Sequence, residues 1–486
     1  MVAAMSNEST AATADAGATP ERFPPQIRFI IGNEGCERFS FYGMKNTLTF
    51  FLINYLLVAL PSPEREATGK AHYHLFVSAC FLTPLFGGYL ADRFLGKYRT
   101  IFALSILYTC GNLCLALFVD SKAGFYTGLG LIALGTGGIK PCVSSFVGDQ
   151  FTEKNKHLVK HVFALFYWII NFGSFFASAS IPKTLEVFGP RVAFGIPGVL
   201  MIASTVVLWL GRRLYIDVPP TGANPHSFFR VLRDALGSRR AARGAAGSAQ
   251  PAGSERPHWL DAAADLHPPE AIEGAKAVLR VLLIFSPIPL FWALWDQKGS
   301  TWVLQATRMD LQLGPVKLAA SQLMALNPLL VMLIIPFTSL VLFPALERRG
   351  VRLTPLRRMG AGMVITGLSF AAVGALQLFI DRGQTLSVLW QAGPYLLLTL
   401  GEVLVSTTGL EFAYTQAPRQ MKGTIMSFWL LAVTVGNLIT AAIAGLNVFA
   451  GAAQFFFFAI AILLAAAAFA LLARRYVVRD FFQAAG

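Results

Sequence analysis

One short segment combines ionisable and aromatic side chains within a stretch that is otherwise apolar. Residues 32–46 read GNEGCERFSFYGMKN. At 3.6 residues per turn, the side chains of this segment that share one helical face are Glu34, Glu37, Arg38, Phe41, Tyr42 and Lys45. A charge facing lipid costs about 2.5 to 3.5 kcal/mol on insertion scales, so we expect this face to look into a protein interior or a water-filled cavity, as in proton and ion pathways. The alternative is a set of salt bridges that hold helices together.

Later apolar stretches carry isolated charges and helix breakers of the same kind. Lys140 lies beside a proline in GTGGIKPCVSSF, and Asp296 and Lys298 interrupt FWALWDQKGSTW. Asn327 also precedes a proline, and Glu402 is the single charge in YLLLTLGEVLV. Charges and helix breaks at corresponding places in two apolar halves predict a central site between two helix bundles, the arrangement of secondary transporters.

The remainder of the chain supplies the membrane helices that would position these residues. Of the 486 residues, 55% are hydrophobic and 14% are charged, which is more apolar than a soluble domain. A span needs ~20 mostly apolar residues. The stretches that satisfy this length are 27–58, 72–91, 99–119, 124–148, 158–180, 192–212, 277–304, 318–345, 357–380, 390–414, 424–446 and 451–473. They predict an all-α integral membrane protein of two six-helix bundles, with no extra helix pair between the halves.

The chain divides into five parts on this interpretation. Residues 1–26 form a disordered tail, 27–213 and 276–477 form the bundles, 214–275 form a linker, and 478–486 form a second tail. Lys and Arg concentrate in the loops on the side of the termini, so both termini and the linker are predicted to be cytoplasmic. The net charge of +14 then faces an anionic leaflet. Nucleic acid is not favoured as a partner, because the basic residues are scattered and no binding module is recognisable.

The linker contains one segment with helical periodicity. In SFFRVLRDAL (227–236), Phe228, Val231, Leu232 and Leu236 recur at roughly helical spacing beside arginines. This pattern predicts an interfacial helix on the cytoplasmic leaflet. A mobile tether is the alternative, and the Gly- and Ser-rich composition of 237–257 is typical of a flexible linker.

Several motifs resemble those of one known family. EGCERFSFYG at 34–43 resembles the ExxERFxYY signature of the proton-dependent oligopeptide transporter (POT) family, within the major facilitator superfamily. GGIKPCVSSFVGDQF at 137–151, FYWIINFGSFF at 166–176 and GEVLVSTTGLEFAYTQAPRQMKG at 401–423 agree with the same family. GGYLADRFLGKYRT at 87–100 resembles the loop between the second and third spans of the superfamily.

The resemblance implies a symporter of protons with di- and tripeptides that works by alternating access as a monomer in the plasma membrane. Protons would be the coupling ion, with no other cofactor. A small peptide is a zwitterion whose charged ends lie about 7 Å apart when two residues are extended. The cations implied for its carboxylate are Arg38, Lys45 and Lys140. The groups implied for its ammonium are Glu402, Asn171 and Asn327.

The resemblance also implies proton coupling. The candidate residues are Glu34, Glu37, Arg38, His74 and Asp296. Arg38 and Lys140 would hold Glu37 ionised until the peptide carboxylate takes over these cations, after which burial favours protonation of Glu37. Protonation and peptide binding would then reinforce one another. For His74, simple hydrogen bonding at the membrane interface is the alternative role.

The resemblance also implies roles for two further sets of residues, in the pocket and at the cytoplasmic gate. The expected aromatic walls of the pocket are Tyr42, Trp292, Phe412 and Trp429, with packing in the core or against lipid as the alternative. The expected cytoplasmic gate residues are Asp92, Arg93 and Glu411, with helix capping and membrane anchoring as the alternative.

The chain also departs from the family pattern, and other functions compete. Phe41 replaces the first Tyr of the signature, Phe81 stands where a pocket Tyr is common, Lys45 replaces Arg, and Lys298 replaces a Gln. A proton-coupled transporter of nitrate or of peptide-like compounds is the nearest alternative, and an ion channel is a more distant one. An enzyme is not expected, because the sequence contains no HExxH or GxSxG motif and no metal-ligand cluster at membrane depth.

Overall fold

The computed structural model describes residues 23–220, 222, 224–245, 258–351, 353–416, 418 and 421–477, with only the backbone of residues 153, 154, 156 and 239–245. The predicted tails 1–26 and 478–486 therefore lie outside the described residues, apart from residues 23–26. Nearly all of the described chain is helical. The one sheet within it is a two-stranded antiparallel hairpin of β1 (Gln312–Leu313) and β2 (Val316–Lys317), which pairs Gln312 with Lys317.

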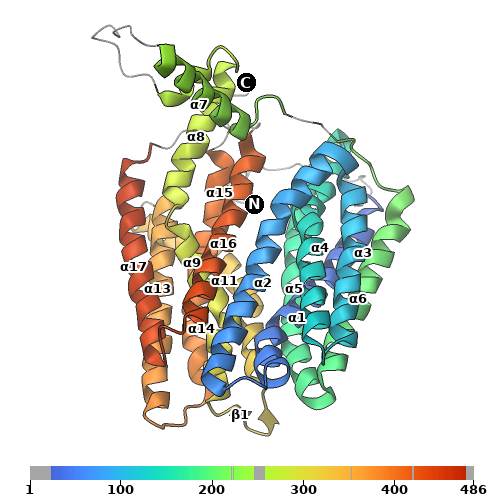
Figure 1. The fold of residues 1–486 in the computed structure, drawn as a ribbon, viewed down its shortest axis with the longest axis vertical. Helices are drawn as coiled ribbons and strands as arrows, with labels where there is room; N and C mark the ends of the chain where they lie inside the picture. The colour runs from blue at the N-terminus through green and yellow to red at the C-terminus, as the bar shows by residue number, and fades with distance from the viewer. Residues whose placement is uncertain are drawn as a thin grey trace.

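Two helix bundles lie side by side (Figure 1). The N-terminal bundle consists of α1 (Ile27–Phe51), η2 (Leu52–Leu56), α2 (Ser62–Leu90), η3 (Ala91–Leu95), α3 (Lys97–Leu117), α4 (Lys122–Asp149), η4 (Glu153–Leu158), α5 (Val159–Phe188), α6 (Pro190–Leu210) and η5 (Gly211–Arg213). The C-terminal bundle consists of α8 (Pro269–Phe285), α9 (Ile288–Trp295), η7 (Asp296–Gly299), α10 (Thr301–Thr307), η8 (Ala320–Ala325), α11 (Leu326–Phe337), η9 (Thr338–Leu342), α12 (Phe343–Arg348), α13 (Pro355–Asp381), η10 (Val388–Gln391), α14 (Ala392–Glu402), η11 (Val403–Thr407), α15 (Thr408–Thr415), α16 (Lys422–Gly445) and α17 (Ala452–Arg475). Between them the linker forms α7 (Phe228–Ala245) and η6 (Trp259–Ala263).

The spans of the described chain match the predicted six-plus-six pattern. Ten helical stretches are long and apolar enough to cross a membrane, and α8 with α9–α10, bent by 49°, is an eleventh. α1 has 25 residues and carries Glu34, Glu37, Arg38 and Lys45, so composition alone does not mark it as a span. It nevertheless packs between α5 and α6 as a full member of its bundle. The prediction of two six-helix bundles is thus confirmed, because α1 is the twelfth span.

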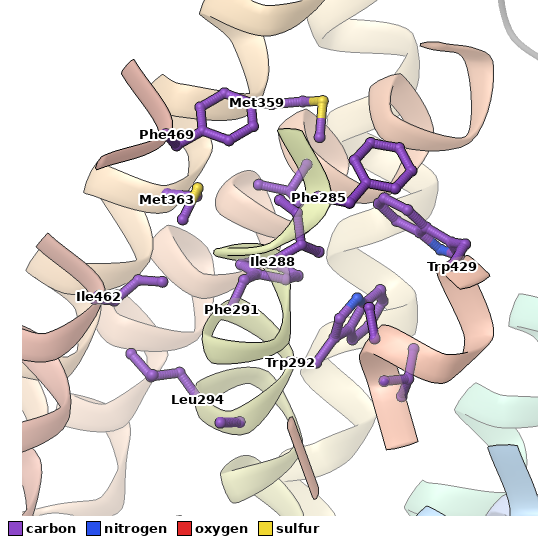
Figure 2. Packing of buried hydrophobic residues seen from close by; sticks show 14 of the residues in the cluster. Phe285, Ile288, Phe291, Trp292, Leu294, Met359, Met363, Trp429, Ile462 and Phe469 are labelled. Atoms are coloured by element: carbon purple, nitrogen blue, oxygen red, sulfur yellow. The ribbon is translucent and has the colours of Figure 1, made fainter. Parts of the chain in front are cut away.

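Each bundle has its own apolar core. The buried apolar residues fall into one cluster per bundle. Figure 2 shows part of the C-terminal cluster, where Phe285, Phe291, Trp292 and Trp429 pack together. Because each core is contained within one bundle, the bundles can move against one another without being unpacked.

Glycines allow the closest helix contacts. A Cβ at Gly87 of α2 would lie 2.0 Å from the carbonyl oxygen of Gly137 in α4. By contrast, a Cβ at the neighbouring Gly88 would meet its nearest atom, the Cβ of Pro141, at 3.8 Å. Small residues are common where membrane helices approach closely, since dispersion contacts hold such helices together. Gly87 therefore fixes the spacing of α2 and α4.

Hydrogen bonds join the two bundles near the end that carries β1 and β2, which we call the hairpin end; the opposite end, which carries α7, is the linker end (Figure 1). At the hairpin end Gln322 Nε2 donates to the Ala179 carbonyl at 2.5 Å, and Arg308 lies 3.2 Å from the Glu66 carboxylate. Further donor–acceptor pairs across the bundles are Thr49 with Gly299, Lys70 with Gln454, Ser78 with Thr434 and Lys183 with Lys317. These contacts hold the bundles together from the hairpin end to about the middle of α2 and α16, where Ser78 meets Thr434.

The linker helix α7 rests on the C-terminal bundle. Phe228, Val231 and Ala235 are buried against η6 and α8, and the ring of Phe228 lies 5.7 Å from that of Phe428 in α16. The predicted helix is therefore present, and it runs on to Ala245, into the stretch that composition assigned to a flexible linker. Protein covers part of the apolar face that we expected on the leaflet. Leu236, which the pattern placed on that face, is 52% exposed.

An acid anchors the same helix to the start of α8. Asp234 pairs with Arg233 at 2.9 Å and with His267 Nε2 at 3.1 Å. Hydrogen bonds from Arg233 and then His267 hold the pKa of Asp234 below its ordinary value, because they stabilise the carboxylate form.

The first part of the linker is fastened to the other bundle. Gln150, at the end of α4, exchanges two hydrogen bonds with the backbone of Ile216, at 2.9 and 3.1 Å. The hydroxyl of Tyr215 donates to the Leu208 carbonyl of α6 at 2.9 Å. The linker is thus held by both bundles, at different points along its length.

Candidate functional site

A cavity of about 200 Å³ lies between the two bundles. α1 and α5 line it from the N-terminal bundle, and the segments around η7, α11 and η11 line it from the C-terminal bundle. The charged residues of its wall are Lys45, Lys298 and Glu402. Its polar side chains are Asn46, Asn171, Ser174, Asn327, Ser406 and Thr407. The cavity therefore offers charges of both signs.

The C-terminal wall holds a cation and an acid that one amide bridges. Lys298 Nζ donates to Asn327 Oδ1 at 2.8 Å, and Asn327 Nδ2 donates to Glu402 Oε2 at 2.7 Å. Nδ2 also lies 3.1 Å from Thr399 Oγ1. Breaks in the helices place these groups: Lys298 lies in the 3₁₀ segment η7, and Glu402 directly precedes the π-helical segment η11. Such breaks are frequent at functional sites.

The N-terminal wall is mostly neutral. Asn171 Nδ2 donates to the Tyr167 carbonyl one turn earlier at 3.0 Å, which leaves the amide oxygen of Asn171 as an acceptor. Asn46 donates to Ser178 Oγ at 2.5 Å. Asn171 and Asn327, both expected at the ammonium of a ligand, thus line the same cavity as Glu402, Asn171 from the N-terminal bundle and Asn327 from the C-terminal bundle.

A buried polar network joins the bundles beside the cavity. Lys45 Nζ lies 2.9 Å from Asp296 Oδ1, and Asn437 Nδ2 donates to Asp296 Oδ2 at 2.7 Å. His74 connects to this pair, since its ring nitrogens lie 2.8 Å from Asn437 Oδ1 and 2.8 Å from Ser300 Oγ. Lys45 and Asp296 are 3% and 0% exposed. Lys298 was one candidate for the basic partner of Asp296. In the structure Asp296 pairs with Lys45 instead.

The acid–base cluster of α1 lies one to two turns from the cavity, toward the linker end. Arg38 Nε lies 3.0 Å from Glu34 Oε1 and also contacts the carboxylate of Glu37. Glu37 is fully buried, yet neither of its carboxylate oxygens accepts a hydrogen bond within the described part of the chain. Arg38 does not line the cavity, whereas Tyr42 on the next turn does. Glu37 is therefore a buried acid held by a single cation.

Lys140 projects toward the same region from α4. Its Nζ lies 4.4 Å from the ring centre of Phe41 and 4.0 Å from that of Phe81. This buried ammonium has no hydrogen-bond acceptor among the described residues. The two phenylalanines that replace family tyrosines thus supply ring faces to the cation instead of hydroxyl groups. Lys140, like Arg38, lies outside the lining of the cavity.

The aromatic walls differ from those expected. Tyr42 lines the cavity, but Trp292, Phe412 and Trp429 do not. These three belong to the C-terminal core, where the rings of Trp292 and Trp429 are 6.1 Å apart (Figure 2). Trp295 and Tyr167 line the cavity, but the sequence analysis did not select them. Helical spacing could have indicated both, because Trp295 is three positions before Lys298 and Tyr167 is four positions before Asn171.

The expected gate residues lie near the linker end. Arg93 donates to the Tyr89 hydroxyl at 2.9 Å, within the same stretch of chain. Asp92 is exposed, and its carbonyl accepts from the backbone of Gly222 in the linker at 3.3 Å. Glu411 is partly buried in α15. The structure thus places Asp92 and Arg93 in η3 and Glu411 in α15, near the linker end of opposite bundles.

Two six-helix bundles around a charged cavity define the major facilitator fold. The chain belongs to the POT family, because the model of that family matches residues 98–454. The similarity of motifs noted in the sequence is thereby confirmed at the level of the family.

Named relatives and a solved structure agree with this assignment. Human "Solute carrier family 15 member 2" is 39% identical over 374 residues, covering 74% of this chain and 50% of the relative. "Peptide transporter 3" of Caenorhabditis elegans is 39% identical over 377 residues, covering 74% and 52%. The crystal structure of the POT family transporter PepTSo has 47% identity and a TM-score of 0.86, covering 95% of this chain and 100% of that one. The chain spans about half the length of the curated relatives it matches.

Proposed function

We propose that the protein is a proton-coupled symporter of di- and tripeptides that works by alternating access as a monomer. The observation that carries this proposal is the cavity between the bundles, whose wall contains Glu402 on one bundle and Lys45 on the other. A zwitterion fits such a cavity because its ends carry opposite charges. The name of the nematode relative, a peptide transporter, supports the choice of substrate.

The peptide ammonium binds at the C-terminal wall in this proposal. Glu402 offers a carboxylate, and Asn171 offers an amide oxygen from the opposite bundle. The carboxylate of the peptide binds the cations of the N-terminal bundle in this proposal, namely Lys45, which lines the cavity, and Arg38 and Lys140, which lie beyond its present lining. Since Lys140 has no acceptor among the described residues, an incoming carboxylate would satisfy it.

Proton coupling follows from the position of Glu37. Arg38 contacts this buried acid, and Glu34 shares the same arginine. When the peptide carboxylate attracts Arg38, burial favours the neutral form of Glu37, which takes up a proton. Asp296 and His74 are the second pair to which the proposal assigns proton coupling, because Asn437 bridges them within the network that joins the two bundles.

The orientation in the membrane is part of the proposal. We place the linker end and both termini in the cytoplasm of a cell whose plasma membrane carries the protein, with basic loops against the anionic leaflet. The bundles are joined at the hairpin end, so this conformation is closed to the outside. Asp92, Arg93 and Glu411 would close the cytoplasmic side in the opposite state.

The test is uptake of labelled dialanine into liposomes under an imposed proton gradient. The parent should accumulate the peptide, whereas Glu37→Gln should exchange peptide but lose accumulation against its gradient. Asp120→Asn, a surface acid paired with Arg191 within the N-terminal bundle, is the matched control and should behave as the parent. Lack of accumulation by the parent would refute the proposed function, and undiminished accumulation by Glu37→Gln would refute the role of Glu37.

A further inference from the structure

The cavity contains a cation that the binding of a simple zwitterion does not require. Lys298 lines the cavity from η7 and lies on the same wall as Glu402. Its Nζ is 3.1 Å from the ring centre of Trp295, which also lines the cavity. The ammonium of Lys298 therefore contacts the ring of Trp295, and the side chain also borders the cavity.

The contacts of this ammonium leave capacity for a ligand. A lysine ammonium has three N–H donors. Within the described residues, one of them is used, by Asn327 Oδ1 at 2.8 Å. Lys298 is 4% exposed and lines the cavity, so a further partner of its remaining donors must reach it through the cavity. A buried ammonium with free donors favours an anionic ligand.

The amide of Asn327 determines the distance between the charged groups of a ligand that binds both Lys298 and Glu402. Asn327 contacts Lys298 with its oxygen and Glu402 with its nitrogen, so the cation and the acid are separated by a single amide group. A ligand that binds both must carry its own anion and cation within a few bonds of one another. In a peptide, the first residue satisfies this condition when its side chain is acidic, since its ammonium and its side-chain carboxylate share one Cα.

We propose that Lys298 makes the cavity selective for peptides whose first residue carries an acidic side chain. This inference rests on the proposed function and names its substrate class. The ammonium of such a peptide binds Glu402, its side-chain carboxylate binds Lys298, and its terminal carboxylate faces the N-terminal bundle. A basic first residue is disfavoured, because its side chain meets Lys298 at close range.

Competition between isomeric peptides tests the inference in liposomes containing the full chain. Unlabelled glutamyl-alanine, alanyl-glutamate, dialanine and lysyl-alanine compete with labelled dialanine for uptake. Glutamyl-alanine should compete about tenfold better than alanyl-glutamate, as expected for one additional hydrogen bond between charged groups in a buried site. Lysyl-alanine should compete least well.

Substitutions of Lys298 test whether this residue causes the preference for an acidic first residue. In Lys298→Gln the ratio of the two glutamate isomers should fall to near one, and Lys298→Met serves if the first variant does not fold. Lys122→Gln, an exposed lysine at the start of α4, is the control and should keep the ratio of the parent. Equal competition by both isomers in the parent, or an unchanged ratio in either Lys298 variant, would overturn the inference while leaving dipeptide transport intact. If the parent takes up no dipeptide, the proposed function itself fails.

Discussion

Replacing Asp296 by asparagine should shift the protein toward a state that is open at the hairpin end. Asp296 is completely buried and accepts from Lys45 at 2.9 Å and from Asn437 at 2.7 Å. Asparagine keeps the shape and one acceptor but removes the negative charge. Lys45, itself 3% exposed, would then be a buried cation without its counter-charge.

The magnitude follows from the burial of the pair. Removing one partner of a buried ion pair costs about 3 to 5 kcal/mol, because the remaining charge is left unpaired. This cost falls on the closed state, since parting the bundles at the hairpin end would let water reach Lys45. At about 1.4 kcal/mol for each factor of ten, the ratio of open to closed molecules should rise about a hundredfold or more in Asp296→Asn.

Distances between spin labels measure this ratio. Val187 at the end of α5 and Val316 in the hairpin are 61% and 56% exposed and belong to opposite bundles. Labels on cysteines at these two positions, in a background without the native cysteines, should give one short distance in the parent. In Asp296→Asn a longer distance should dominate or rise strongly.

Two comparisons make the measurement decisive. Glu66→Gln breaks another ion pair between the bundles, with Arg308, but the two side chains are 30% and 49% exposed. Its effect should stay below about 1 kcal/mol. The double variant Lys45→Met/Asp296→Asn removes both charges and should return toward the closed distance. The reasoning is wrong if Asp296→Asn leaves the distance distribution unchanged, or if Glu66→Gln shifts it equally.

Three further variants test other parts of the structure. Gly87→Ala should lower the melting temperature in detergent, because overpacking of this kind costs about 1 to 3 kcal/mol, whereas Gly88→Ala should not; equal melting temperatures would contradict the close contact of α2 with α4. Asp234→Asn should increase hydrogen exchange in residues 228–238 at pH 7. Because the pKa of Asp234 is lowered in the folded state, its contribution is complete above the unfolded value of about 3.9 and is lost as the pH falls through the lower folded value, so parent and variant should converge in strong acid. Identical exchange at pH 7 would remove the anchoring role. Glu402→Gln should raise the concentration of dialanine for half-maximal uptake about tenfold or more, through loss of a hydrogen bond between charged groups; an unchanged value would show that the ammonium binds elsewhere.

Local sequence patterns were sufficient for the helices and for the charged face of α1. The spacing of Glu34, Glu37 and Lys45 requires only the period of a helix, and charges in an apolar segment require an interior to face. The sequence also predicted that Glu402 lies in the central site, because a single acid within a membrane helix is too costly to face lipid.

Tertiary packing decided the rest. Lys45 and Asp296 are 251 positions apart, and no local rule links a cation in the first span to an acid in the seventh. The choice between Trp292 and Trp295 as the cavity wall depends on how α9 is rotated beyond the 49° bend, which its neighbours in the C-terminal bundle determine. Sequence spacing shows which residues share one face of a helix, but it does not show which part of the protein that face contacts.

The anchoring of the linker also decides which part of it stretches when the bundles rock. Ile216 is fastened to α4, and α7, which begins at Phe228, travels with the C-terminal bundle. Gly222 is also held by the N-terminal bundle, since its backbone N–H donates to the Asp92 carbonyl at 3.3 Å. The connection from Gly222 to Phe228 is therefore six peptide steps long and spans about 20 Å when fully extended. α7 and η6, the described elements of the later part of the linker, both pack against α8 of the C-terminal bundle, so fluorescent proteins or affinity tags inserted between these two elements should leave the rocking motion unhindered.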